Sequence, residues 1–133
     1  MKLAKPSFIL SFVLAAGVCQ AAITTEVIGN FNGECVAYAR QKVPSLPSGL
    51  YTLADKKKVI NSRTCKAGSV AIIDVGNYGH VAVVEKCDSS GSTQSITITE
   101  ANYKPGKITR RQSKVSKISK AESELKILGY YRP

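Results

Sequence analysis

The amino-acid sequence predicts an α+β domain: one short helix that carries a cysteine, packed on a sheet of five to six antiparallel strands. Three observations support this fold class. Apolar residues recur at helical spacing just after Gly33, β-branched segments separated by turn residues fill the chain from Ala67 onward, and the 133 residues leave room for one domain at most. That domain is expected over residues 22–133, after a leader over residues 1–21.

The leader is predicted from its charge and hydropathy. Lys2 and Lys5 precede an apolar run without acidic residues over 8–18, and small residues follow it. This run is too short to cross a membrane and has the pattern of a secretory signal peptide. Cleavage is therefore expected near Ala21.

The expected leader determines the compartment in which the mature protein is found. Cys19 leaves a lipid-anchored form open as an alternative, although Val18 stands directly before it, where a small residue is typical. No second hydrophobic stretch follows the leader, so we expect a periplasmic or secreted monomer without a membrane span. Disulfides persist in such compartments.

A cysteine stands just inside the start of the predicted helix, within residues 33–40. Val36, Ala39 and Val43 recur at helical spacing, so one face of this helix can pack on a core. A helix N-terminus lowers the pKa of a thiol because its free N–H groups and macrodipole favour negative charge. Cys35 is therefore expected to be a reactive thiolate, with inert packing of the cysteine as the alternative.

The residues beside this helix have expected roles of their own. Gly33 lets the backbone bend before the helix and lets a substrate approach the sulfur, and Asn30 or Asn32 is available to cap the first turn. A mostly irregular segment follows, with a short helix around Leu53–Val59. Its lysines, Lys56–Lys58, are expected to form a solvated surface.

The rest of the chain has strand patterns and two more cysteines. Strands are predicted over Ser69–Asp74, Val81–Cys87, Ser95–Glu100, Ile108–Val115 and Leu125–Tyr131. The first two form a hairpin, and pairing about Gly76 sets Cys65 opposite Cys87. We therefore predict a Cys65–Cys87 disulfide, which contributes about 3 kcal/mol for a loop of this size, and a free Cys35.

His80 is the only histidine, so any chemistry that needs an imidazole must use it. Strand alternation places Glu100 and Asn102 on the face that carries Ile96 and Ile98, in a buried row. A buried carboxylate without a partner is costly, so Glu100 should contact His80 and fix its tautomer. An arginine or lysine at the sheet edge is the alternative partner.

The cysteines and the histidine allow one alternative interpretation, a metal site. Zinc held by Cys35, Cys65, Cys87 and His80 is conceivable, but the short C-x-x-C pairs that usually build such sites are absent; no metal or other cofactor is expected.

The net charge of +10 falls to +8 when Lys2 and Lys5 leave with the leader. Outside the cytoplasm this charge favours cell-wall polymers and anionic lipid surfaces over nucleic acid. A basic segment over 104–120 carries the candidate wall-docking residues Arg110, Arg111 and Lys114, with a merely solvated face as the alternative.

Five segments occur in a characteristic order: Gly33–Ala39, Lys66–Ala71, Gly79–Glu85, Thr99–Tyr103 and Leu128–Pro133. Together they resemble CHAP domains, the cysteine, histidine-dependent amidohydrolases/peptidases, whose fold is a minimal relative of papain. The resemblance implies that Cys35 is the nucleophile and His80 the general base and acid. It implies that Glu100 orients His80, with Asn102 assisting or taking that role.

Members of this family commonly cut peptidoglycan, at the amide joining muramic acid to L-alanine or within the peptide stem and cross-bridge. We therefore expect an N-acetylmuramoyl-L-alanine amidase or a stem endopeptidase. The Cys35 N–H and the Asn32 side chain are the expected oxyanion donors.

Two departures from the family pattern concern the substrate groove, because Val36-Ala37 replaces the usual Thr-Trp and the chain has no tryptophan. The alternatives are a catalytically idle wall-binding or inhibitory protein, and an acyl transferase that uses the same site.

Overall fold

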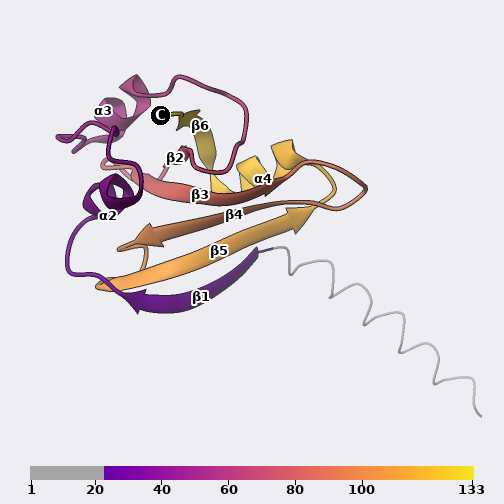
Figure 1. Cartoon of the computed structure of the whole chain (residues 1–133), viewed down its shortest axis with the longest axis horizontal. Helices are drawn as coiled ribbons and strands as arrows, with labels where there is room; N and C mark the ends of the chain where they lie inside the picture. The colour runs from indigo at the N-terminus through magenta and orange to yellow at the C-terminus, as the bar shows by residue number, and fades with distance from the viewer. Residues whose placement is uncertain (1–22) are drawn as a thin grey trace, which may run out of the picture.

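The computed structural model describes residues 23–133, so the predicted leader, its cleavage near Ala21 and Cys19 lie outside the described residues. Figure 1 shows three helices around one sheet. The elements are β1 (Ile23–Asn30), α2 (Cys35–Lys42), α3 (Leu53–Lys58), β2 (Val70–Ile73), β3 (His80–Asp88), β4 (Gln94–Ala101), β5 (Lys107–Val115), α4 (Ile118–Leu125) and β6 (Ile127–Tyr131).

All strand pairs are antiparallel, and the strand order is β1-β5-β4-β3-β2-β6. The predicted α+β class and the antiparallel sheet are therefore confirmed, with six strands. Of the three helices, none is long and apolar enough to span a membrane within the described part of the chain.

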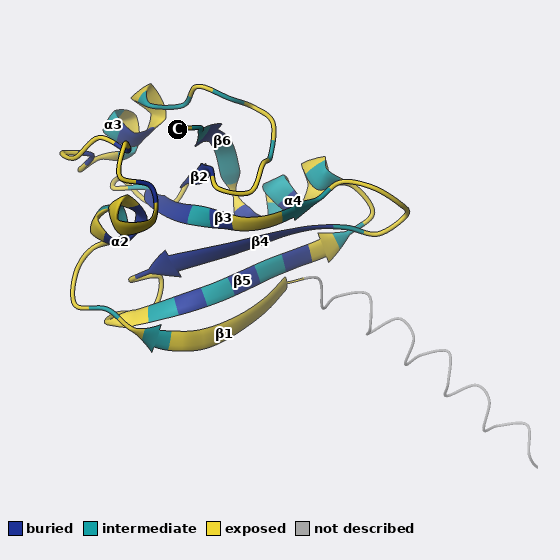
Figure 2. Ribbon diagram, viewed as in Figure 1, coloured by how far each residue is buried: buried dark blue, intermediate teal, exposed yellow. Residues whose placement is uncertain are grey.

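The two longer helices cover opposite faces of this sheet. Along β2, Val70 and Ile72 pack in a cluster with residues of α2, whereas Ala71 and Ile73 pack in a second cluster with residues of α4. Successive side chains of a strand point to opposite faces, so each helix buries one face. Figure 2 shows the consequence, since β4 is buried along nearly its whole length.

Two elements were missing from the sequence prediction. The strand β1 pairs with β5 at the edge of the sheet and is exposed along almost its whole length, so its sequence carries no alternation of buried and exposed residues. The helix α4 places Ile118, Ala121 and Leu125 on one side, and the sequence prediction had assigned Leu125 to the last strand.

The predicted disulfide is present. Cys65 and Cys87 are bonded, with their Cα atoms 6.1 Å apart, and they tie the segment before β2 to the end of β3. The hairpin register pairs Val70 with Val83, close to the predicted one. Cys35 is the free cysteine among residues 23–133.

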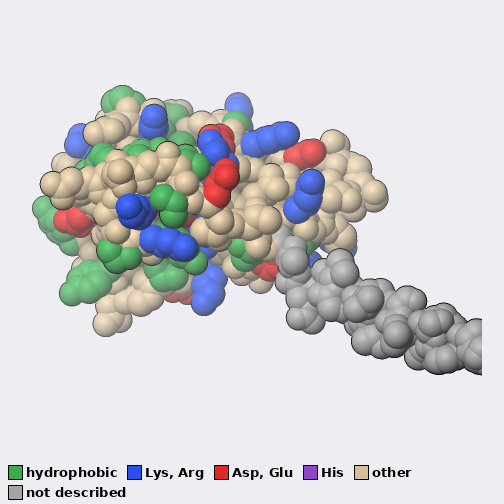
Figure 3. Space-filling model, turned by 90° about the horizontal axis from the view of Figure 1, so that it is seen from below, with side chains coloured by type: hydrophobic (Ala, Val, Ile, Leu, Met, Phe, Trp, Pro, Cys, Tyr) green, Lys and Arg blue, Asp and Glu red, His purple; other side chains and the backbone are tan. Residues whose placement is uncertain are grey.

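The predicted wall-docking residues do not form one surface. Arg111 is only 7% exposed and its guanidinium binds a buried carboxylate, so its inclusion was wrong. Arg110 is partly exposed but pairs with Glu26 and Glu85, which offset its charge, while Lys114 is exposed. On the face seen in Figure 3, Lys and Arg side chains are scattered and several lie beside acidic ones.

Candidate active site

Cys35 is the first residue of α2, as predicted, and it is half-buried. The N-cap residue, Glu34, makes no side-chain hydrogen bond to the helix, and the first intrahelical bond runs from the Tyr38 N–H to the Glu34 carbonyl. The N–H groups of the first turn, including that of Cys35, therefore lack intrahelical acceptors. They favour negative charge at the sulfur and on any oxygen bound beside it.

The predicted capping of this helix was wrong. The Oδ1 atom of Asn30 accepts a hydrogen bond from the Lys107 ammonium at 2.9 Å, and Asn32 is exposed. The role of Gly33 is steric, because a Cβ atom there would lie 2.7 Å from the ring of Phe31. Glycine therefore lets Phe31 lie close to the start of α2.

His80 is the first residue of β3 and is buried. Its Nε2 atom lies 3.0 Å from Oε1 of Glu100, so the expected pair is present. The Nδ1 atom remains for the Cys35 thiol, which lines the same pocket as the imidazole. Gly79, with φ +67°, brings the chain into β3, and a Cβ atom there would lie 2.8 Å from Leu53.

Glu100 is completely buried on β4 and has three protein partners. Besides His80, it accepts hydrogen bonds from Thr109 at 3.1 Å and from Arg111 at 2.8 and 2.9 Å. The alternative arginine partner is thus present together with the histidine. Burial raises the pKa of Glu100, but the hydrogen bonds from His80 and Arg111 outweigh it and hold that pKa below its usual range.

Arg111 connects this carboxylate to an aromatic side chain. Its guanidinium lies 3.9 Å from the ring centroid of Tyr103, and that ring lies 6.3 Å from the ring of His80. A planar guanidinium suits both bidentate pairing and stacking. Arg111 thus fixes Glu100, and Glu100 fixes His80.

The thiol and the imidazole stabilise each other's charged forms. Burial raises the pKa of Cys35, but the hydrogen bond and charge of His80, with a hydrogen bond from the Val81 backbone, bring that pKa below its ordinary value. Burial lowers the pKa of His80, and the hydrogen bonds to Cys35 and Glu100 more than reverse this, raising it to about 9. Each group therefore favours the charged form of the other, which is the direction that activates a thiol as a nucleophile.

A pocket of about 350 Å³ opens beside this pair; its lining residues are Glu34, Cys35, Tyr51, Lys56, Tyr78, Gly79, His80 and Asn102. Asn102 adopts a left-handed conformation, with φ 64°, and its Oδ1 atom accepts a hydrogen bond from the Gly106 N–H at 3.4 Å. Asn102 lines the same pocket as His80, but Glu100 is the residue hydrogen-bonded to Nε2 of His80. Asn32, the expected oxyanion donor, is not among the residues that line this pocket.

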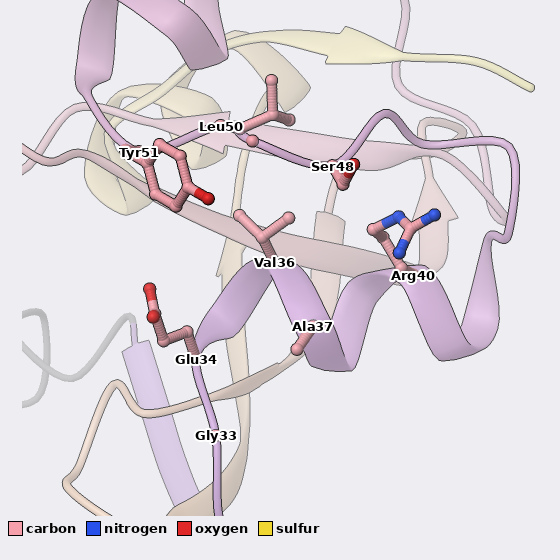
Figure 4. Close-up of a pocket in the computed structure, with 9 residues that line it drawn as sticks. Gly33, Glu34, Val36, Ala37, Arg40, Ser48, Leu50 and Tyr51 are labelled. Carbon is pink, nitrogen blue, oxygen red and sulfur yellow. The ribbon is translucent and has the colours of Figure 1, made fainter.

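A second cavity, of about 360 Å³, adjoins the first, because Glu34 and Tyr51 line both. Figure 4 shows it between α2, which contributes Val36 and Arg40, and the segment that carries Ser48, Leu50 and Tyr51. The cavity along α2 thus lies next to the pocket that Cys35 lines.

Sequence reasoning missed the burial of Lys56, which is 3% exposed, so its assignment to a solvated surface was wrong. The available signal was the Thr52–Asp55 capping box, which fixes the frame of α3 and turns Leu53 and Lys56 to one side. The partnership of Thr109 and Arg111 with Glu100 was also readable, since alternation places both on one face of β5.

The zinc alternative does not fit the described residues. Two of its four proposed ligands are bonded to each other in the disulfide. Across residues 23–133, no three His, Cys, Asp or Glu side chains are grouped so as to hold a metal ion.

Comparison with known proteins agrees with the geometry. A segment of 59 residues is 44% identical to the N-acetylmuramoyl-L-alanine amidase sle1 of Staphylococcus saprophyticus; it covers 43% of this chain and 17% of that protein, so the match spans less than a fifth of the relative's length. No solved structure matches the chain significantly. Residues 26–102, more than half of the 133, match the CHAP domain family. The chain belongs to the CHAP domain family.

Proposed function

We propose that this protein is an exported peptidoglycan hydrolase that cleaves an amide bond with Cys35 as nucleophile and His80 as general base and acid. The observation that carries the proposal is the free thiol at the start of α2, which shares a pocket with an imidazole whose Nε2 atom is held by a buried carboxylate. Membership of the CHAP family and the similarity to a protein named as a muramoyl-alanine amidase support the substrate class.

Acylation begins from the thiolate–imidazolium pair. The sulfur attacks the amide carbonyl carbon, and the carbonyl oxygen becomes an oxyanion that the Cys35 backbone N–H stabilises. His80 then gives its Nδ1 proton to the amine nitrogen, the C–N bond breaks, and a thioester remains on Cys35. Glu100 acts as a positioning residue that keeps Nε2 protonated and the ring oriented.

Deacylation uses the same groups in reverse. His80 takes a proton from water, the hydroxide oxygen attacks the thioester carbon, and the C–S bond breaks. The acid product leaves, and the proton held by His80 restores the resting pair. An amine in place of water would give acyl transfer, so the fate of the thioester decides between hydrolase and transferase.

Export belongs to the same proposal. Residues 1–21 are proposed as the signal peptide, and the Cys65–Cys87 disulfide suits the oxidising compartment to which it would lead. Peptidoglycan lies in that compartment.

The test is digestion of purified peptidoglycan by wild type, Cys35→Ala and His80→Ala, followed by mass analysis of the fragments. We expect the wild type to release fragments with a new amino terminus, at L-alanine for an amidase or within the stem for an endopeptidase. Both variants should lose at least about 1000-fold in rate, since nucleophile and base act as a unit. Activity retained in either variant, or peptidoglycan bound but uncut by the wild type, would reject the proposal.

A further inference from the structure

Lys56 is a lysine inside the protein. It lies on α3, is 3% exposed, and its Nζ atom donates hydrogen bonds to the carbonyl oxygens of Leu50 at 2.8 Å and Tyr78 at 2.7 Å. Both acceptors are neutral. Within residues 23–133, the ammonium pairs with no carboxylate within 4.0 Å, so its charge is not offset by an ion pair.

An ammonium has three N–H donors, and the two carbonyl groups use two of them. Lys56 also lines the pocket that contains Cys35 and His80, and its charge helps to lower the pKa of the Cys35 thiol. The third donor is therefore available to a group that enters this pocket. A buried donor without an acceptor is costly, so the site favours an occupant that supplies one.

The charge of that occupant follows from the chemistry at the sulfur. A thiolate at Cys35 offsets part of the Lys56 charge, because the two groups line one pocket and attract each other. When a thioester forms, the sulfur becomes neutral and Lys56 loses that counter-charge. Glu34 lines the same pocket but is exposed, so water screens its charge more strongly than that of buried Lys56. An anionic oxygen in the substrate would restore the balance.

The two carbonyl tethers define where such an oxygen would sit. Leu50 lines the cavity along α2, and Tyr78 lines the pocket beside Cys35, so Lys56 lies where these two cavities meet. A group bound there lies beside the cavity along α2, which favours a substrate residue next to the scissile amide over the amide itself.

We propose that Lys56 determines specificity by binding a free carboxylate of the substrate residue adjacent to the scissile amide. This inference rests on the proposed peptide-cleaving function for the identity of the substrate. The site itself can be tested without cleavage, because the Cys35 sulfur reports which charges its pocket accepts.

The first experiment compares two alkylating reagents that differ in charge, iodoacetate and iodoacetamide. The rate of modification of the Cys35 peptide is measured by mass spectrometry in wild type, Lys56→Met and Lys57→Met. Lys57 is the matched control, because it is the next residue, carries the same charge and is exposed. The ratio of the two rates cancels any general change in thiol reactivity.

We expect the iodoacetate-to-iodoacetamide ratio of wild type to exceed that of free cysteine, and Lys56→Met to lower it about 10-fold, as expected for losing a charge from the pocket that contains the sulfur. Lys57→Met should leave the ratio unchanged. A wild-type ratio no higher than that of free cysteine would overturn the proposal without any variant. A ratio unchanged in a folded Lys56→Met protein, or lowered equally in Lys57→Met, would also overturn it.

The second experiment uses two synthetic stem peptides that differ only in a carboxylate or a carboxamide on the residue next to the scissile bond. Wild type should cleave the carboxylate form with a KM about 10-fold lower, and Lys56→Met should lose this preference, so that it cleaves the two forms with equal KM. Equal losses on both peptides would instead mean that Lys56 only ties the Leu50 and Tyr78 loops together, which contradicts the proposal. If wild type cleaves neither peptide, cleavage within the stem is excluded from the proposed function, and the alkylation ratio still decides the site.

Discussion

Arg111 was expected on a wall-docking surface but is buried against Glu100, and replacing it tests this buried contact. In Arg111→Met the chain keeps an aliphatic side chain of similar length but loses both hydrogen bonds to Glu100 and the stacking on Tyr103. The carboxylate of Glu100 is completely buried and would retain only Thr109 and His80.

Removing one partner of a buried, hydrogen-bonded ion pair costs about 3–5 kcal/mol, because the other charge stays buried without compensation. A domain of this kind is stable by only about 5–15 kcal/mol, so the loss is a large part of the total. Arg110 is the matched control. It is the neighbouring residue, its ion pairs are partly exposed, and Arg110→Met should cost at most about 1 kcal/mol.

The assay is urea unfolding followed by tyrosine fluorescence and far-ultraviolet circular dichroism. The slope of the free energy of unfolding against urea should be the same in all three proteins, so that a shift in midpoint measures stability. A stability of Arg111→Met within about 1 kcal/mol of that of Arg110→Met would refute the buried network.

Three further predictions concern stability. The folded pKa of Glu100 lies below its usual range, so the stability that Glu100 contributes is present above its unfolded pKa and is lost as pH falls through its folded pKa. Because Arg111→Met raises that folded pKa, acid unfolding of this variant should begin at a higher pH than that of wild type. An unchanged midpoint of acid unfolding would argue against the Arg111–Glu100 pair. Replacing Cys65 and Cys87 together by alanine should cost about 3 kcal/mol in urea unfolding, and a loss under about 1 kcal/mol would show that the bond adds little. Gly33→Ala should lower the free energy of unfolding by about 1–3 kcal/mol, because the added Cβ atom displaces the Phe31 ring. Gly91→Ala is the comparison: Gly91 has a positive φ but open space around it, so this variant adds backbone strain without a clash. It should leave the reactivity of Cys35 unchanged.

Much of the fold was predictable from local patterns. The helix that begins at Cys35 and the hairpin of β2 and β3 follow from apolar periodicity and turn residues, and the disulfide follows from the hairpin register. The strand β1 was not predictable in this way, because an edge strand that is exposed along almost its whole length has no burial pattern in its side chains.

The candidate site was predictable where one residue type was unique or costly to bury. His80 is the only histidine, and Glu100 continues an apolar row, so each required a partner. Arg111 and Lys56 lie in basic runs that look solvated. The local signals that distinguish them from Arg110 and Lys57 are strand alternation and the Thr52–Asp55 capping box, and these set only the frame of β5 and α3. Their burial depends on which face of β5 or α3 meets the protein interior, and that is decided by tertiary packing.

The central claim is that His80 keeps Cys35 as a thiolate, and the pH dependence of Cys35 alkylation by iodoacetamide tests it most directly. Because the folded pKa of Cys35 lies below its ordinary value and that of His80 is about 9, the charged pair should persist between these two values. The midpoint of the wild-type rate should therefore lie below the ordinary thiol pKa of about 8.5, and His80→Ala should shift that midpoint to this pKa or above it. The same midpoint in both proteins would contradict the account.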